Sequence, residues 1–221
     1  MRFTVHQPNF LPYLGFFDKV RQVDTLVFLD DVQYTRRGFT NRNRIKKPDG
    51  PMWLTVPITG KTMTAINQVE IATHIDWKKR HLSTMKHLYG KTQFYSEITP
   101  LLEDIYSKDW ILLSDFNIAL LKLCFEFLQI SVDMKFSSSM DIEEEQGGGR
   151  IIKIGRKLGA SEYFSGKSGR DYLELSKFQE EGIDVSFQEF THPTYEQQFG
   201  EFMPNLSIID YLFNVGPKPF W

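Results

Sequence analysis

Apolar and polar residues recur along this chain with two periods, one typical of strands and one typical of helices. Residues 2–5 alternate polar and apolar side chains, and the apolar residues between 14 and 23 then recur at helical spacing. The same criteria predict further strands over 25–29, 132–136, 163–164 and 185–190. They also predict further helices over 150–158, from Asp171 onward and over 206–214. Strands that alternate with helices indicate an α/β fold with a mixed, mostly parallel sheet and helices on both faces, in a Rossmann-like arrangement.

A block of helical periodicity interrupts the strands between about 76 and 129. It contains three predicted helices, which begin near Trp77, Ile98 and Trp110. We therefore expect a single α/β domain over 1–221, with an inserted helical subdomain at about 76–129 that walls a substrate cleft.

Polar segments separate these elements. Residues 34–50 are basic and are predicted to form a loop that ends in a turn at Asp49-Gly50, before strands over 53–58 and 66–71. Residues 143–149 carry three glutamates and three glycines and are also predicted to be a loop. Their spacing matches neither a phosphate loop nor a dinucleotide-binding fingerprint, so a plain loop is favoured over a mobile lid or an anion contact.

Composition narrows the class of protein. The 221 residues suffice for one substantial core, and the formal net charge of −2 gives no global attraction to nucleic acid, so DNA is not an expected partner. The single cysteine, Cys124, lies in an apolar run and is predicted to be inert packing in a chain without internal disulfides. No stretch approaches the roughly 20 apolar residues that span a bilayer, so we expect a cytoplasmic protein without membrane insertion.

A dense basic cluster stands out against this balanced charge. Its cations all fall within twelve positions: Arg36, Arg37, Arg42, Arg44, Lys46 and Lys47. Such a cluster suits phosphates, a pyrophosphate or the acidic surface of a carrier, although a solvated basic loop has the same composition.

The most informative motif is His6-Gln7-Pro8-Asn9-Phe10-Leu11-Pro12, because it follows a predicted strand and precedes a predicted helix. Open α/β sheets bind ligands at such strand ends. His6 is the best candidate for a general base, and the amides of Gln7 and Asn9 are candidate substrate contacts. The alternative is a histidine that only fixes the loop by hydrogen bonds.

The next predicted strand ends in two carboxylates, Asp30 and Asp31. Adjacent strand positions point to opposite faces, so only one of them can share a face with His6. We favour Asp30 as the group that orients His6 and assign Asp31 to substrate binding, with a pair that caps a turn as the alternative.

Other polar residues at loops and strand ends are candidate substrate contacts. Asn41, Arg42 and Asn43 place two amides beside a guanidinium, which suits a carboxylate, a phosphate or sugar hydroxyls. The remaining candidates follow later strands: Ser165, Lys167, Ser168, Tyr172, His192 and Tyr195.

Several kinds of chemistry lack support in the sequence. The histidines do not have zinc-ligand spacing, and the adjacent Asp30 and Asp31, although a magnesium site is possible there, do not by themselves establish one, so no metal is expected. No serine nucleophile elbow and no cysteine at a strand-to-helix turn is present, so an acyl-enzyme is not expected either. Direct transfer between two bound substrates, with a general base to deprotonate an amine or hydroxyl, is favoured.

Five segments together resemble the WbqC-like family, in order along nearly the whole chain. They are His6–Gly15, Asp30–Gln33, Asn41–Asn43, Tyr163–Gly166 and Leu206–Asp210. The resemblance implies a bacterial protein of surface-polysaccharide gene clusters. It also implies glycine transfer onto an amino sugar of the O-antigen of lipopolysaccharide.

On this resemblance the substrate would be an amino sugar or nucleotide sugar, and no cofactor is expected. The aminoacyl donor would be held on a carrier protein or tRNA. Arg42 and Lys167 would then meet the pyrophosphate or the donor. The loops after the first strand and at 165–168 are also similar in placement to those of nucleotidylyltransferases, which leaves two alternatives: an ATP- and Mg²⁺-dependent adenylate-forming or nucleotidyl-transfer enzyme, and a non-catalytic nucleotide-sugar-binding protein.

Overall fold

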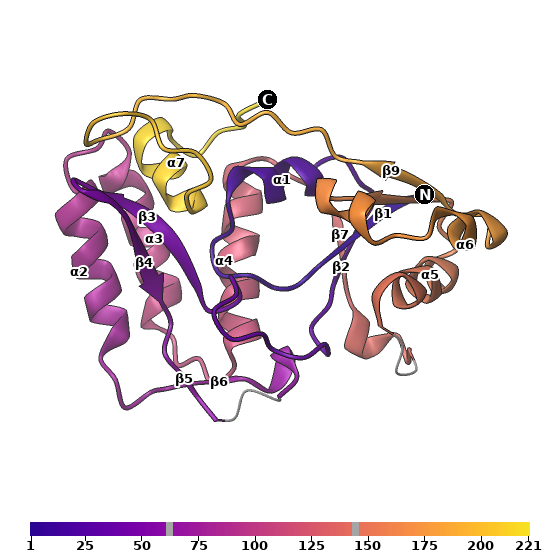
Figure 1. Ribbon diagram of the computed structural model, residues 1–221. Coiled ribbons are helices and arrows are strands. Elements are labelled where there is room, and N and C mark those ends of the chain that lie inside the picture. Colours follow the sequence, from indigo (N-terminus) through magenta and orange to yellow (C-terminus); the bar gives the residue numbers. More distant parts are fainter. Residues whose placement is uncertain (61–63, 143–145) are drawn as a thin grey trace. The chain divides into compact units, whose positions relative to one another are not determined.

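The chain forms two compact units, each assembled from three separate segments. A computed structural model describes residues 1–60, 64–142 and 146–221 (Figure 1). The first unit comprises Met1–Gln7, Gly15–Asp31 and Ser131–Thr191. The second comprises Pro8–Leu14, Val32–Ile130 and His192–Trp221.

A five-stranded parallel sheet forms the centre of the first unit. Its strands are β1 (Arg2–His6), β2 (Thr25–Phe28), β7 (Asp133–Phe136), β8 (Glu162–Ser165) and β9 (Asp184–Phe187). Their order in the sheet is β7-β2-β1-β8-β9, and every pairing is parallel. The predicted α/β class is therefore confirmed. Strand order changes direction between β1 and β8, which makes their boundary the topological switch point of the sheet.

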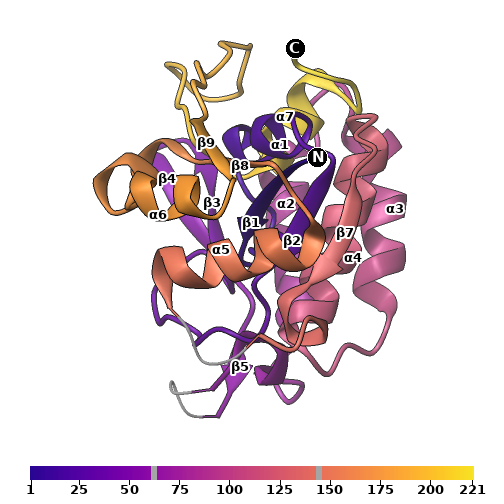
Figure 2. The same ribbon diagram turned by 90° about the vertical axis from the view of Figure 1, so that its right-hand side faces the viewer.

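Helices cover both faces of this sheet. Helix α5 (Gly147–Leu158) covers one face (Figure 2). It packs so closely that a Cβ at Gly155 would lie 3.0 Å from the ring of Phe3. Helix α6 (Leu175–Glu180) joins the same core through Phe178. On the opposite face α1 (Leu14–Val20) places the ring of Phe16 edge-on to that of His6, with 4.8 Å between ring centres.

The second unit combines helices with two small antiparallel sheets. One sheet pairs β3 (Arg42–Lys47) with β4 (Gly50–Thr55), and the other pairs β5 (Ile58–Thr59) with β6 (Glu70–Ile71). Its helices are α2 (Trp77–Tyr89), α3 (Tyr95–Ser107), α4 (Leu113–Phe127) and α7 (Ile208–Val215). The predicted helical block thus belongs to a unit that extends well beyond 76–129, and the single-domain assignment stays a prediction.

Aromatic side chains form much of the core of the second unit. The ring of Phe116 lies 5.2 Å from that of Tyr106, 5.3 Å from that of Trp77 and 6.1 Å from that of Phe10, measured between ring centres. Cys124 is buried on α4, and burial raises the pKa of its thiol, as expected for inert packing. Within the described residues, no helix has both the length and the apolar character needed to cross a bilayer.

Two predicted elements before the helical block were wrong. Residues 34–50 are not a continuous loop, because Arg42–Lys47 forms β3 of a hairpin. The sequence of β3 does not show the usual alternation of apolar and polar residues, because its buried positions include the polar side chain of Asn43 as well as Ile45. The predicted strand over 66–71 begins as a 3-10 helix at Ile66–Gln68 and becomes a strand only at Glu70.

Two element boundaries in the first unit were also misplaced. Gly147–Gly149 form the first turn of α5, because the buried apolar face of that helix outweighs the low helix propensity of glycine. Glu143–Glu145 of the same predicted loop lie outside the described residues. The helix predicted to begin at Asp171 is a 3-10 helix over Lys167–Asp171, and α6 begins only at Leu175.

Candidate functional site

The backbone pairing between β1 and β8 ends before the strands do. Strand β1 pairs with β2 as far as His6, but with β8 only at Arg2 and Phe3. The next contact to β8 comes from a side chain, the Thr4 hydroxyl, which donates to the carbonyl oxygen of Phe164 over 2.7 Å. Ligands of open α/β sheets bind beyond the carboxyl ends of the strands at such a switch point. This edge of the first unit is therefore the candidate site.

His6 ends β1 at this edge and is half-buried. Its Nδ1–H donates to the carbonyl oxygen of Gln7 over 2.9 Å, which leaves Nε2 unprotonated. Burial, followed by the positive charge of Lys19, lowers the pKa of His6 to about 3, although the hydrogen bond to Gln7 opposes the shift. The ring is consequently neutral at neutral pH and a weak base. Its role as a general base stays a prediction.

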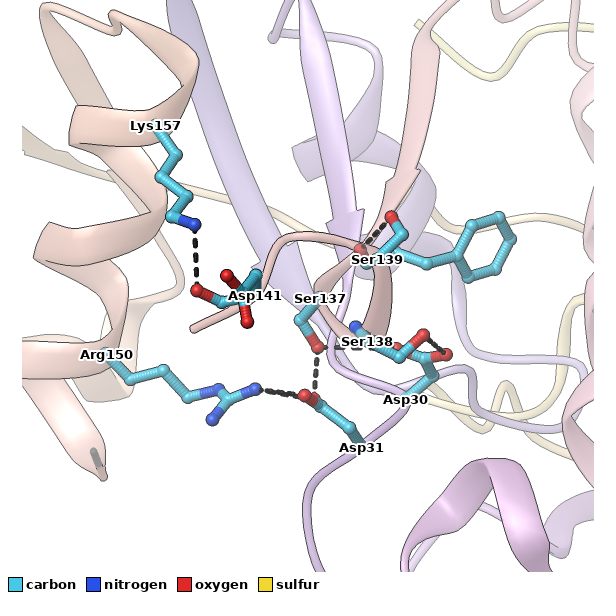
Figure 3. A network of polar contacts seen from close by, with 9 residues as sticks. Asp30, Asp31, Ser137, Ser138, Ser139, Asp141, Arg150 and Lys157 are labelled. Carbon is cyan, nitrogen blue, oxygen red and sulfur yellow. Dashed lines mark hydrogen bonds and ion pairs between the residues drawn. The ribbon is translucent and has the colours of Figure 1, made fainter. Parts of the chain in front are cut away.

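Asp30 contacts the turn after β7, and its described hydrogen bonds do not include His6. Its carboxylate accepts from the backbone N–H of Ser138 over 3.0 Å, from the Ser138 hydroxyl over 2.6 Å and from the Ser137 hydroxyl over 3.3 Å (Figure 3). These contacts match the alternative of a turn cap. The prediction that Asp30 orients His6 has no supporting contact.

Asp31 forms an ion pair with a residue that sequence reasoning missed. Nη2 of Arg150, in the first turn of α5, lies 2.6 Å from both carboxylate oxygens of Asp31, and the Ser137 hydroxyl also donates to Asp31 (Figure 3). Arg150 is buried. A cation in the first turn of a helix is disfavoured by the helix dipole, and this position was the available signal that Arg150 has a specific partner. A substrate-binding role for Asp31 stays a prediction.

Four residues in and after the turn that follows β8 were predicted to contact substrate, and they differ in burial. Ser165 is buried, and a Cβ at Gly169 would lie 2.0 Å from its hydroxyl oxygen, so this turn requires glycine at 169. Lys167, Ser168 and Tyr172 are exposed. We conclude that Ser165 builds the turn, while the other three present polar groups at the edge of β8.

Lys19 is a second residue that sequence reasoning missed. Its Nζ donates to the carbonyl oxygen of Val5 in β1 over 3.1 Å, and the residue is only 7% exposed. Burial lowers the pKa of Lys19 to about 8. A cation flanked by the apolar positions Phe16 and Val20 on a core-facing helix was the signal that could have identified it.

The side-chain amides of Asn41 and Asn43, which were predicted to contact substrate, form hydrogen bonds within the second unit. Asn41 accepts from the Tyr34 hydroxyl over 2.8 Å and donates to the carbonyl oxygen of Val56 over 2.9 Å. Asn43 donates to the carbonyl oxygen of Leu11 over 2.7 Å. These buried bonds account for both amides without a ligand, and their substrate-binding role stays a prediction.

Arg42 lies on the outer face of the same hairpin. Its guanidinium stacks 4.0 Å above the ring centre of Trp53 and donates to the carbonyl oxygen of Arg37 over 2.6 Å. Asn9 accepts a long hydrogen bond of 3.4 Å from the Thr40 hydroxyl. Arg42 and Asn9 are both half-buried. A contact between either residue and substrate stays a prediction.

A buried carboxylate, Asp210, binds Tyr195 in the second unit. Asp210 is fully buried on α7 and accepts from the hydroxyls of Tyr195 and Tyr89, each over 2.9 Å, and from the amide of Gln197 over 2.7 Å. Burial raises the pKa of Asp210, and these donors oppose that rise. The Tyr195 hydroxyl is thus committed to an internal network that the sequence did not reveal, since Asp210 lies in an apolar helix pattern.

His192 repeats the local geometry of His6. Its Nδ1–H donates to the carbonyl oxygen of Pro193 over 2.8 Å, and burial lowers its pKa. The ring also packs against those of Tyr195 and Phe202, with ring centres 6.2 and 5.6 Å apart. These contacts explain its orientation, and a substrate contact stays a prediction.

Comparison with known proteins identifies the family. The uncharacterized protein Rv1507c of Mycobacterium tuberculosis is 34% identical over 220 residues, which cover 97% of this chain and 94% of the relative. No solved structure matches the chain significantly. The model of the WbqC-like protein family matches residues 7–220. The chain therefore belongs to the WbqC-like protein family.

Proposed function

We propose that this chain is a transferase that binds an amino sugar, presented as a nucleotide sugar, at the carboxyl end of its parallel sheet. It would pass an aminoacyl group, in the first instance glycyl, to the sugar amine during synthesis of surface polysaccharide. The observation that carries the binding part is the switch point between the neighbouring strands β1 and β8, where β1 ends at His6 and the Lys167–Ser168 turn follows β8. The aminoacyl chemistry and the O-antigen setting rest on the family resemblance.

The proposed reaction places a condition on His6. The amine nitrogen forms a bond to the acyl carbon, the bond from that carbon to the donor's leaving group breaks, and the amine proton is taken up by Nε2 of His6. A base with a pKa of about 3 takes up this proton poorly. Because the charge of Lys19 contributes to that low pKa, an anionic substrate that offsets this charge would make His6 a stronger base.

Nucleotidyl or adenylyl transfer from ATP is the second candidate. It is compatible with the same low pKa, since phosphates held by Lys167 and Ser168 do not require His6 to accept a proton. The exposed Lys167 and Ser168 suit phosphate oxygens in either case. A protein that binds nucleotide sugars without catalysis would use these groups as well.

Ligand-dependent thermal unfolding separates the candidates. Nucleotide sugars with a free amine should raise the melting temperature of the wild-type protein, because a ligand that binds only the folded state stabilises it by mass action. Stabilisation by ATP with Mg²⁺ but not by these nucleotide sugars would favour nucleotidyl transfer instead.

Mass spectrometry tests the reaction itself. Each stabilising nucleotide sugar is incubated with the protein and, in turn, with a glycyl carrier thioester, glycyl-tRNA or glycyl adenylate. The proposal expects a product heavier by one glycyl residue with one of these donors. Binding without product from any of them supports the non-catalytic alternative.

A further inference from the structure

Lys19 has unusual surroundings for a buried cation. It is 7% exposed, and its hydrogen bond within the described residues is the one to the Val5 carbonyl oxygen. Among those residues no carboxylate lies within ion-pair distance of Lys19. The neighbouring carboxylate, Asp18, accepts instead from Arg21 over 2.8 Å and from Gln188 over 2.7 Å.

The hydrogen bond to Val5 places the ammonium at the switch point. The carbonyl oxygen of His6 accepts from the backbone N–H of Leu29, next to β2. Successive carbonyl groups of a strand point in opposite directions, so the carbonyl of Val5 points toward β8. At that level the β1–β8 pairing has already ended at Phe3. The Lys19 ammonium therefore occupies the position at which a backbone N–H of β8 would otherwise donate.

Electrostatics make this position receptive to an anion. Removing an ammonium from water costs several kcal/mol unless an opposite charge compensates it. An ammonium has three N–H donors, and the Val5 carbonyl accepts from one of them. The lowered pKa values of Lys19 and His6 both reflect the cost of burying positive charge here without a counter-charge.

We propose that Lys19 binds a phosphate oxygen of the ligand at the switch point. The ligand group is a pyrophosphate, as found in nucleotide sugars and in nucleoside triphosphates. Lys167 and Ser168 on the exposed turn after β8 provide further donors. This inference rests on the proposed function only in placing the ligand at this edge. It adds a link between binding and catalysis, because the bound anion offsets the charge that weakens His6 as a base.

Calorimetric titration with inorganic pyrophosphate tests the binding role. We expect Lys19→Met to weaken pyrophosphate binding by about tenfold or more, as for the loss of a charge-assisted hydrogen bond, and Lys19→Arg to retain part of the affinity. The matched control is Lys122→Met, the same substitution at an exposed position of α4. Unchanged affinity in Lys19→Met, or no pyrophosphate binding by the wild type, would overturn the inference.

Proton titration of His6 by NMR gives a second result that does not depend on Lys19→Met folding. Saturating pyrophosphate should raise the pKa of His6 in the wild-type protein, and an unchanged pKa contradicts the inference. Lys19→Met should raise it without any ligand, because the charge of Lys19 contributes to the low value.

The outcome also separates this inference from the proposed function. Nucleotide-sugar binding that is equal in wild type and Lys19→Met leaves the function in place and removes Lys19 from it. Pyrophosphate and ATP binding that depends on Lys19, without any nucleotide-sugar binding, supports the inference and contradicts the proposed substrate.

Discussion

Each of the two units buries a charged group, and the two groups differ in their hydrogen-bond partners. In the second unit Asp210 is surrounded by donors from Tyr89, Tyr195 and Gln197. In the first unit Lys19 has one backbone carbonyl as its hydrogen-bond partner within the described residues. A buried charge whose hydrogen-bond partners are all supplied by the protein stabilises the fold that supplies them. A buried charge with remaining donors, at an edge where ligands bind, is instead suited to recognition.

Removal of Asp210 should produce the largest change in stability. Asp210→Ala leaves the hydroxyls of Tyr89 and Tyr195 and the amide of Gln197 without their buried acceptor. We expect the free energy of unfolding to fall by about 3–5 kcal/mol, because each buried donor left without an acceptor costs about 1–3 kcal/mol. Urea denaturation measures it, and Asp109→Ala, at a fully exposed position, is the control. A loss below about 1 kcal/mol would remove the contrast between the two sites.

Substitution of His6 should affect turnover more than folding. We expect His6→Ala to reduce kcat by about a hundredfold in the glycyl-transfer assay, the lower range for loss of a general base. His6→Asn keeps a polar side chain but cannot take up the proton, so it should lose as much activity. Full turnover in both variants would show that His6 only holds the loop.

Acid should destabilise the second unit through His81. Its Nε2–H donates to the Thr55 carbonyl oxygen over 2.9 Å, and burial lowers the pKa of His81 to about 4. Since the pKa is lower in the folded state, the unfolded chain binds a proton first, and stability is lost as pH falls from about 6.5 toward 4. We expect a loss of about 3 kcal/mol from this residue. Unfolding free energies measured against pH should decline less steeply in His81→Asn, and equal slopes would contradict this assignment.

The smallest expected effect has the opposite sign. Lys19→Met removes a buried cation that lacks a counter-charge, so we expect a stability gain of about 1 kcal/mol at pH 7. Because burial lowers the pKa of Lys19, its destabilising effect is complete below about pH 8 and disappears as the pH rises toward 10.5. Thermal unfolding at pH 7 and at pH 10 measures both. A large loss of stability at pH 7 would show that Lys19 is structural.

Local pattern was sufficient to predict the strands of the parallel sheet and the helices that follow them. Strand β1 was found from its alternation of polar and apolar residues, and β2 from a nearly continuous apolar run, which is typical of buried parallel strands. Strand β3 was missed because polar residues such as Asn43 point inward, where they bond backbone carbonyls. Such bonds depend on partners that no local pattern specifies.

The candidate site was predicted at the level of strand ends but not of individual partners. The positions of His6 and of the turn at 165–169 follow from where the strands stop. The partner of Asp31 is Arg150, 119 positions away, and the Lys19 contact to Val5 requires α1 to fold back on β1. These contacts arise from tertiary packing, which explains why Asp30 was assigned to His6 while its described contacts are Ser137 and Ser138.

The most direct test of the account is to map a bound ligand by backbone amide NMR. On addition of a nucleotide sugar with a free amine, we predict shifts at His6, Gln7 and Lys19 and over 166–169, with none near Asp210. Shifts confined to the surroundings of Asp210, or a spectrum unchanged by this ligand, would show that the switch point is not the substrate site.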